Sequence, residues 1–142
     1  MSNKEVLDIL MQGREAWKEW RAENLLTFPR LIGANLSGAD LRSYNFFGAA
    51  FFGVNLSGAD LSNAVLNGAL LLNSDLSNAN LKGANLDSAT LNGSILENTN
   101  FENCAMGGIV FQRNDLSKCI GLDTITVGWP ASIDYPTLKT TE

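Results

Sequence analysis

Residues 31–61 read LIGANLSGADLRSYNFFGAAFFGVNLSGADL, and a large apolar residue falls at every fifth position of this stretch. The frame continues through 18 units without a slip, with the first centre at Leu31 and the last at Leu116. A period of five matches neither the 3.6-residue repeat of a helix nor the two-residue alternation of a strand, so the chain must turn within every unit. The sequence therefore predicts a coil whose sides are five residues long.

The positions around each apolar centre are also restricted. The residue two positions before it is usually small, Asn or Asp precedes it directly in ten units, and Gly or Asn is common two positions after it. Gly and Asn tolerate a positive φ, which marks the corners of the coil. Segments 35–41 and 55–61 are identical at all seven positions, and segment 75–81 is similar. The sequence therefore also has a 20-residue period, which corresponds to four five-residue sides in each turn.

The pattern A-D/N-L-x-G, as in Ala39-Asp40-Leu41 and Ala59-Asp60-Leu61, resembles the pentapeptide-repeat family. The resemblance covers residues 29–121 and implies an all-β solenoid, a right-handed quadrilateral parallel β-helix of about 4.5 coils, because 18 units are shared among four sides. It also implies that the apolar centre and the small residue point inward. The other three positions of each unit are then expected to lie outside.

Residues 1–28 precede the repeats and are predicted to form an α-helical cap followed by a linker. Ser2 and Glu5 have the spacing of a capping box, and the following apolar residues have helical spacing, which predicts one helix over residues 3–23. We expect Trp17 and Trp20 to cover the open edge of the first coil, which would otherwise promote aggregation. The alternative is that these tryptophans anchor a partner.

Residues 122–142 follow the loss of the five-residue frame and are predicted to cap the other end, with Trp129 as part of that cap. Two unusual inward residues lie near the ends. Tyr44 takes a slot for a small residue, so we expect the first coil to widen there beneath the N-terminal helix. Asn114 takes an inward slot near the carboxyl end, where we expect the tail to satisfy polar groups.

Outward side chains stack in columns when a turn takes 20 residues, and one side of the predicted coil is unusually apolar. The candidate protein interface consists of Ile32, Phe52, Leu70, Leu72 and Val110 on this side, with Ala50 beside them, and of Phe47 on the adjoining side, together with Val65. A contiguous exposed apolar area of this kind usually contacts another part of the chain or another molecule. Either a terminal segment folds back over it, or it binds a partner or a second copy of the chain.

The composition restricts the chemistry that the chain can perform. Its 142 residues include no histidine and two cysteines, which excludes histidine-based catalysis and histidine-bearing zinc sites. The columns of Asp and Asn belong to the repeat pattern, and a flat face offers no pocket in which a carboxylate pKa would shift. The sequence thus predicts a protein that is not an enzyme and has no catalytic residues, metal site or cofactor.

The charge and hydropathy of the chain predict which partners it can bind and in which compartment it lies. A net charge of −5 argues against binding nucleic acid or anionic lipid. The N-terminus lacks the features of a signal peptide, and no stretch approaches the ~20 apolar residues of a membrane span, so we expect a cytoplasmic protein. Cys104 and Cys119 are expected to be small interior residues rather than a redox pair.

These observations favour a protein-interaction scaffold of unknown cellular role. The family resemblance, typical of cyanobacteria, also offers an alternative, because some members mimic duplex DNA and protect type II topoisomerases. Residues 31–118 carry seven acids and four bases, a net charge of −3. A DNA segment as long as the predicted rod, about 22 Å, carries about 13 negative charges, so the charge density fits DNA mimicry poorly.

Overall fold

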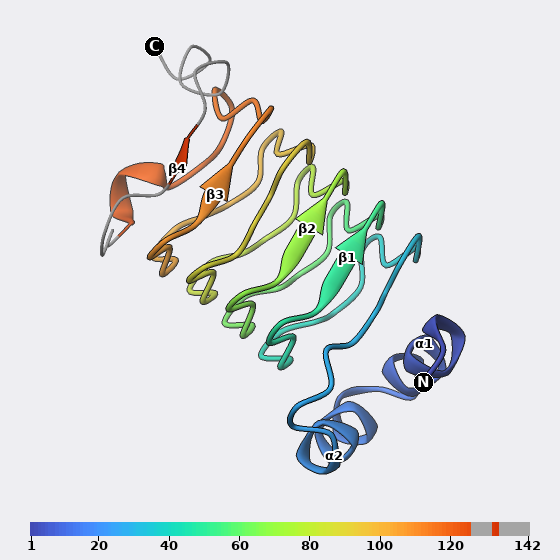
Figure 1. Ribbon diagram of the computed structural model, residues 1–142. Helices are drawn as coiled ribbons and strands as arrows, with labels where there is room; N and C mark the ends of the chain where they lie inside the picture. The colour runs from blue at the N-terminus through green and yellow to red at the C-terminus, as the bar shows by residue number, and fades with distance from the viewer. Residues whose placement is uncertain (126–131, 134–142) are drawn as a thin grey trace.

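The computed structural model describes residues 1–125 and 132–133. The chain begins with two helices, α1 (Asn3–Met11) and α2 (Arg14–Glu23), and continues into stacked coils. The coils contain the short strands β1 (Ala50–Phe52), β2 (Leu70–Leu72) and β3 (Val110–Phe111). A 3-10 helix, η1 (Leu122–Thr124), and strand β4 (Ser132–Ile133) follow. Figure 1 shows a rod of coils with α1 and α2 at one end and β4 at the other.

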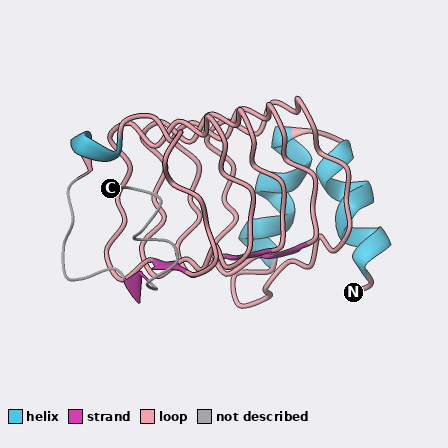
Figure 2. Cartoon of the chain, turned by 90° about the horizontal axis from the view of Figure 1, so that it is seen from above, coloured by secondary structure: helices cyan, strands magenta, loops and turns pink. Residues whose placement is uncertain are grey.

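Parallel pairing between residues 20 apart holds the coils together. β1 pairs with β2 so that Ala50 lies opposite Leu70, and isolated bridges continue the same register from Arg30–Ala50 to Asn100–Ile120. The bridges fall on all four sides of the turn, so most of the rod is built from turns and single bridges rather than from strands, as Figure 2 shows. The predicted four-sided parallel β-helix is confirmed.

The interior of the rod contains the apolar centres of the repeat. Every one of the 18 centres is at most 5% exposed, and most are fully buried. Burial of each such side chain contributes roughly 1.5–3 kcal/mol, which offsets part of the entropy lost by fixing the backbone. The five-residue spacing therefore identified the core correctly.

The corners have the predicted left-handed backbone. The residue two positions after each centre has a positive φ in 17 consecutive units, from Gly33 to Arg113. Gly, Asn and Ser occupy most of these corners, but Arg113 has the same conformation, with φ 56°. A non-glycine residue is strained there, so the stacking of neighbouring coils must impose the corner geometry.

The expectation of one helix over residues 3–23 is wrong, because the helix is broken between α1 and α2. The backbone N–H groups of Gln12 and Gly13 close α1 by donating to the carbonyls of Ile9 and Leu10, each at 3.1 Å. Gly13 then has φ 105°, a value that glycine adopts readily and that ends a helix. The capping box of Ser2 and Glu5 is present as predicted.

Both helices cover the open end of the first coil. The Asn3 side chain exchanges two hydrogen bonds with the Ile32 backbone, at 2.8 and 3.0 Å, and the Trp17 indole donates to the Asn45 carbonyl at 2.9 Å. Trp17 and Trp20 are buried, as expected of a cap. Tyr44 is 6% exposed and its ring centroid lies 6.4 Å from that of Trp17, which confirms that it packs beneath the N-terminal helices.

Asn114 lies near the carboxyl end of the rod. Its side-chain nitrogen donates to the carbonyls of Leu91 and Ser94 in the preceding coil, at 2.6 and 2.9 Å. Most of the tail that we expected to satisfy polar groups here lies outside the described residues. β4 continues the rod by pairing in parallel with β3, Val110 opposite Ser132. The predicted capping residue Trp129 lies outside the described residues.

Candidate interaction surface

The side of the rod that carries β1, β2 and β3, called here the β-face, runs along its length (Figure 1). Ile32, Phe52 and Leu72 form one outward column, with Phe52 directly opposite Leu72 in the parallel register. All three side chains are half-buried, and Leu70, beside Leu72, is 37% exposed. The structure therefore brings these four predicted interface residues together over three successive coils.

The Asn and Asp residues of the repeat serve the turns of the other three sides. Each accepts a hydrogen bond through Oδ1 from the backbone N–H two residues ahead, at 2.9–3.2 Å. The ten residues are Asn35, Asp40, Asn45, Asn55, Asp60, Asp75, Asn80, Asn85, Asn100 and Asp115. Such Asx turns are a structural use of these side chains. The columns of carboxylates thus have a structural explanation without catalysis.

The β-face carries no Asn or Asp at this position, and it forms the extended strands β1, β2 and β3 in three of its units. A turn normally lets the centre carbonyl accept from the N–H three residues ahead, as Leu56 does from Ala59 at 3.0 Å. After β1 this contact is replaced by Ser74 of the next coil, whose hydroxyl accepts from the Val54 N–H at 3.1 Å and donates to the Phe51 carbonyl at 2.7 Å. The buried serine satisfies both backbone groups, so the side can remain extended.

The end of β2 repeats this arrangement one coil further along. The Ser94 hydroxyl accepts from the Ser74 N–H at 3.0 Å and donates to the Leu71 carbonyl at 2.6 Å. Buried polar groups are costly unless they are hydrogen-bonded, and here both backbone groups have a partner. The apolar strands β1 and β2 are therefore supported from inside the rod.

A shallow groove joins the β-face to the adjoining side. It has a volume of about 280 Å³ and is lined by Phe28, Phe47, Gly48, Gly68 and Leu70. The rings of Phe28 and Phe47 lie 6.2 Å apart, and these side chains are 60% and 44% exposed. Gly48 lets Phe28 lie against the corner, since a Cβ at this position would collide with the ring.

Phe28 was missed by the sequence interpretation because it precedes the repeat frame and was assigned to the linker. The only signal was an aromatic residue directly before Pro29, at the entry to the first coil. We call the combined set of Phe28, Ile32, Phe47, Phe52, Leu70 and Leu72 the apolar surface. Its exposed part centres on Phe28, Phe47 and Leu70.

Val110, also predicted for the interface, lies apart from the apolar surface. Leu70 bridges to Thr90, and Thr90 bridges to Val110, so a polar residue separates the two on the β-face. Val110 instead pairs with Ser132 of β4. At the other end, α1 reaches the β-face through the bonds of Asn3 to Ile32, while both helices lie at the end of the rod (Figure 1).

The β-face contains no carboxylate at its outward positions in the described coils. These positions hold Arg30, Ile32, Ala50, Phe52, Leu70, Leu72, Thr90, Asn92, Val110 and Gln112. The whole chain has a net charge of −5, so its acidic residues are concentrated elsewhere. A negatively charged partner is repelled least at this face.

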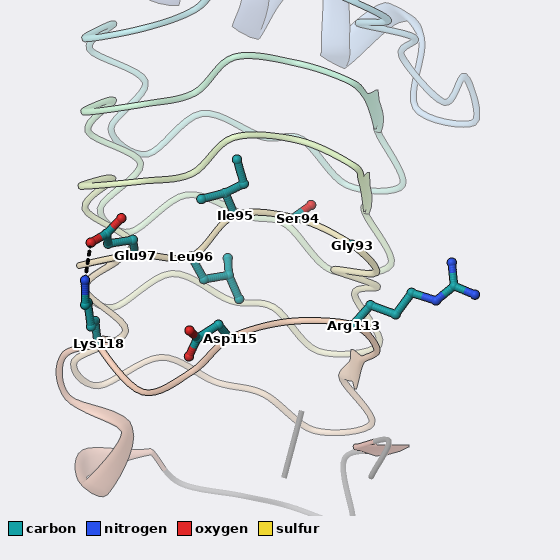
Figure 3. Close-up of a pocket in the computed structure, with 8 residues that line it drawn as sticks. All are labelled: Gly93, Ser94, Ile95, Leu96, Glu97, Arg113, Asp115 and Lys118. Atoms are coloured by element: carbon teal, nitrogen blue, oxygen red, sulfur yellow. Dashed lines mark hydrogen bonds and ion pairs between the residues drawn. The ribbon is translucent and has the colours of Figure 1, made fainter. Parts of the chain in front are cut away.

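A further groove lies on the next side, between the last two coils, and is shown in Figure 3. Its volume is about 290 Å³, and Lys118 and Glu97 form an ion pair of 2.6 Å at its edge. The bridges on this side join Asn55 to Asp75 and Asp75 to Ile95, and the described residues contain none beyond Ile95. The groove thus coincides with the place where the ladder on this side stops.

The described residues offer little other chemistry. Residues 1–125 and 132–133 contain no group of three side chains suited to hold a metal ion. The thiol of Cys104 donates to the Leu81 carbonyl at 2.9 Å, and burial raises its pKa to about 11. Burial likewise raises the pKa of Cys119 to about 12, so both thiols are protonated at neutral pH.

Helices α1 and α2 are both short. Within the part of the chain that the structure describes, no helix has the length and apolar character needed to span a membrane. The longer of the two, α2, has 10 residues.

Comparison with known proteins places this geometry among solved structures. A family model described as pentapeptide repeats, with 8 copies, matches residues 30–68 and 55–93. A pentapeptide repeat protein (Rfr23) from the cyanobacterium Cyanothece 51142 is 43% identical, with a TM-score of 0.60 over 63% of this chain and 61% of that one. The chain therefore spans about three fifths of the length of that relative.

A second solved structure supports the same assignment. A pentapeptide repeat protein from the thylakoid lumen of Arabidopsis thaliana is 28% identical, with a TM-score of 0.63 over 68% of each chain. No curated protein matches the chain. With its right-handed quadrilateral β-helix and five-residue frame, the chain belongs to the pentapeptide-repeat family.

Proposed function

We propose that the protein is a non-enzymatic scaffold that binds proteins through its apolar surface, and that its first partner is a second copy of the chain. The observation that supports this most directly is an exposed apolar surface that borders and partly covers a face without carboxylates. Phe47 and Leu70 are 44% and 37% exposed, and Phe28 is 60% exposed. Contiguous apolar area of this kind is typical of protein interfaces.

The charge distribution favours a second copy as the partner. Two molecules that each carry a net charge of −5 repel one another, and this repulsion is weakest where the facing surfaces have no carboxylates. The β-face meets that condition, and the charged outward residues in its described coils are the cations Arg30 and Arg113. Pairing of two β-faces would bury Leu70 and Phe52 of both copies.

Sedimentation equilibrium over a wide range of protein concentrations tests this proposal. We expect the wild-type protein to dimerise and the Leu70→Asp and Phe52→Asp variants to remain monomeric, because each would place carboxylates within an apolar contact. Ile95→Asp is the matched control, since Ile95 is 55% exposed but lies on another side of the rod.

Circular dichroism should show that the variants retain the fold, because both substituted side chains point outward. A wild-type protein that stays monomeric at every concentration would contradict self-association. Dimerisation of Leu70→Asp as strong as that of Ile95→Asp would contradict the role of the β-face as the dimer interface.

DNA mimicry is less well supported by the side-chain contacts. Three of the seven acids in residues 31–118 form ion pairs, which join Asp40 to Arg42, Glu97 to Lys118 and Glu102 to Lys82 at 2.6–3.0 Å. This pairing further lowers a charge density that is already several-fold below that of DNA. We expect no protection of a type II topoisomerase from a quinolone in a supercoiling assay, and clear protection would favour the alternative.

A further inference from the structure

A cavity of about 280 Å³ lies between α2 and the first coil, away from the apolar surface. Its helix side is formed by Arg14, Trp17, Lys18, Arg21, Ala22 and Leu25, and its coil side by Ser43, Tyr44 and Asn45. The spacing of three, four and seven residues places the helix members on one face of α2. Three of the nine lining residues are cationic and none is a carboxylate.

Arg21 is the most unusual member of this cavity. It is only 4% exposed, and its Nη1 donates to the Thr27 carbonyl at 2.6 Å, while its guanidinium lies 5.8 Å from the Trp20 ring centroid. Its Nε is buried and has no hydrogen-bond partner, and no carboxylate pairs with it in the described structure. A buried charge without a counter-ion is costly, so an anion in the cavity would stabilise it.

The other two cations are also available to a ligand. Arg14 lies 3.7 Å from an Asp40 oxygen, but that carboxylate is already held by two 2.7 Å hydrogen bonds from Arg42. Lys18 is exposed and forms no ion pair in the described structure. Together with Arg21, these residues make the cavity a positive region on an otherwise acidic molecule.

The walls of the cavity are aromatic and apolar. The Trp17 indole is fixed by its hydrogen bond to the Asn45 carbonyl, and the Arg14 guanidinium lies 5.7 Å from the Tyr44 ring centroid. The Tyr44 hydroxyl forms no hydrogen bond within the described residues, so it remains available as a donor. Rigid rings beside cations suit a ligand that has both an apolar body and a negative charge.

From these contacts we infer that the cavity binds a small organic anion, namely a carboxylate attached to an aromatic body. The carboxylate would receive charge-assisted hydrogen bonds from Arg14, Lys18 and Arg21. The aromatic body would lie against the apolar part of the lining, formed by Ala22 and Leu25 beside the Trp17 and Tyr44 rings. This site is separate from the apolar surface and does not depend on dimerisation.

Isothermal titration calorimetry with cinnamate tests the site. We expect cinnamate to bind, cinnamyl alcohol to bind at least about tenfold more weakly because it lacks the charge, and acetate to bind weakly because it lacks the ring. Affinity for cinnamate should fall as salt is added. Equal binding of cinnamate and its alcohol, or no binding of cinnamate, would overturn the inference.

Variants of the three cationic residues test which of them bind cinnamate. Arg14→Gln and Lys18→Gln should each weaken cinnamate binding about tenfold, and Arg21→Lys should weaken it because an ammonium group cannot replace the planar guanidinium with its several N–H donors. Lys82→Gln is the matched control, since Lys82 is an exposed cation that does not line the cavity. If Arg21→Lys fails to fold, the two exposed variants still decide. An effect of Lys82→Gln equal to theirs would overturn the site.

The same chemistry could come from a free aromatic acid or from the carboxyl terminus of a protein that ends in an aromatic residue. A short peptide ending in phenylalanine, compared with its amide, distinguishes these sources. Tighter binding of the free-acid peptide than of cinnamate assigns the site to a protein terminus. Tighter binding of cinnamate assigns it to a small acid.

Discussion

Single buried hydroxyl groups satisfy the backbone at the ends of two strands of this rod, β1 and β2. Most sides end in a turn stabilised by an Asn or Asp side chain, but β1 and β2 remain extended and leave a carbonyl and an N–H apart at their ends. Ser74 and Ser94, contributed by the following coils, bridge these groups. The repeat places a small residue at positions 74 and 94. Serine is small enough to fit there, and its hydroxyl, unlike the alanine methyl group, bonds both the carbonyl and the N–H.

The Ser74→Ala variant should lower the free energy of unfolding by about 1–3 kcal/mol, because the Phe51 carbonyl and the Val54 N–H would be left buried without a partner. Chemical denaturation measures the change. Ser37→Ala is the control, since the Ser37 hydroxyl bonds only to the exposed Asn35 side chain, and we expect a change within about 0.5 kcal/mol. Equal stability of the two variants would refute the bridging role of Ser74.

At the scale of elements, α1 and α2 close the end of the rod because they are two short helices rather than one long one. A straight helix over residues 3–23 would be about 31 Å long at a rise of 1.5 Å per residue. The break at Gly13 instead lets α1 bring Asn3 to Ile32 and lets α2 bring Trp17 to Asn45. The two contacts lie on adjacent sides of the first coil, so both the edge and the interior of that coil are covered.

Asn3→Ala tests the closure by α1. The change removes both hydrogen bonds to the Ile32 backbone and should lower the free energy of unfolding by about 1–2 kcal/mol, although alanine favours the helix slightly. Hydrogen exchange at the Ile32 amide should accelerate. Lys4→Ala, which breaks only an exposed ion pair with Asp8, should change stability by about 0.5 kcal/mol or less. Unchanged exchange at Ile32 in Asn3→Ala would contradict the role of Asn3.

At the scale of the whole molecule, the buried thiols make stability depend on alkaline pH. Burial raises the pKa of Cys104 to about 11 and that of Cys119 to about 12, so the folded state keeps protons that the unfolded state releases above its ordinary pKa near 9. The stabilisation is complete below pH 9 and is lost as the pH rises toward 11 and 12. The free energy of unfolding should therefore fall over this interval.

The double variant Cys104→Ala and Cys119→Ala isolates the contribution of the thiols from that of other groups that titrate at high pH. Its free energy of unfolding should decline less steeply above pH 9 than that of the wild type. Denaturant titrations at several pH values measure both slopes. Identical slopes would show that the thiols ionise equally in the folded and unfolded states.

The repeat made the core predictable, because five-residue spacing and small inward residues determine which side chains can be enclosed. The same periodicity concealed the break at Gly13, since glycine fell on the apolar stripe without interrupting it. The carbonyls of Leu91 and Ser94 that accept from Asn114 could not be predicted, because they are backbone groups of another coil. Phe28 and the cavity beside α2 depend on how the linker and helices dock, which repeat spacing does not encode.

The ladder that joins residues 20 apart also limits how this protein can be lengthened or shortened. Duplication of one complete coil would add about 4.8 Å to the rod and preserve every downstream contact. Loss of a single five-residue unit would instead rotate all later coils by a quarter turn. Leu72 would then leave the column of Phe52, so natural variation in length is expected to occur in whole coils.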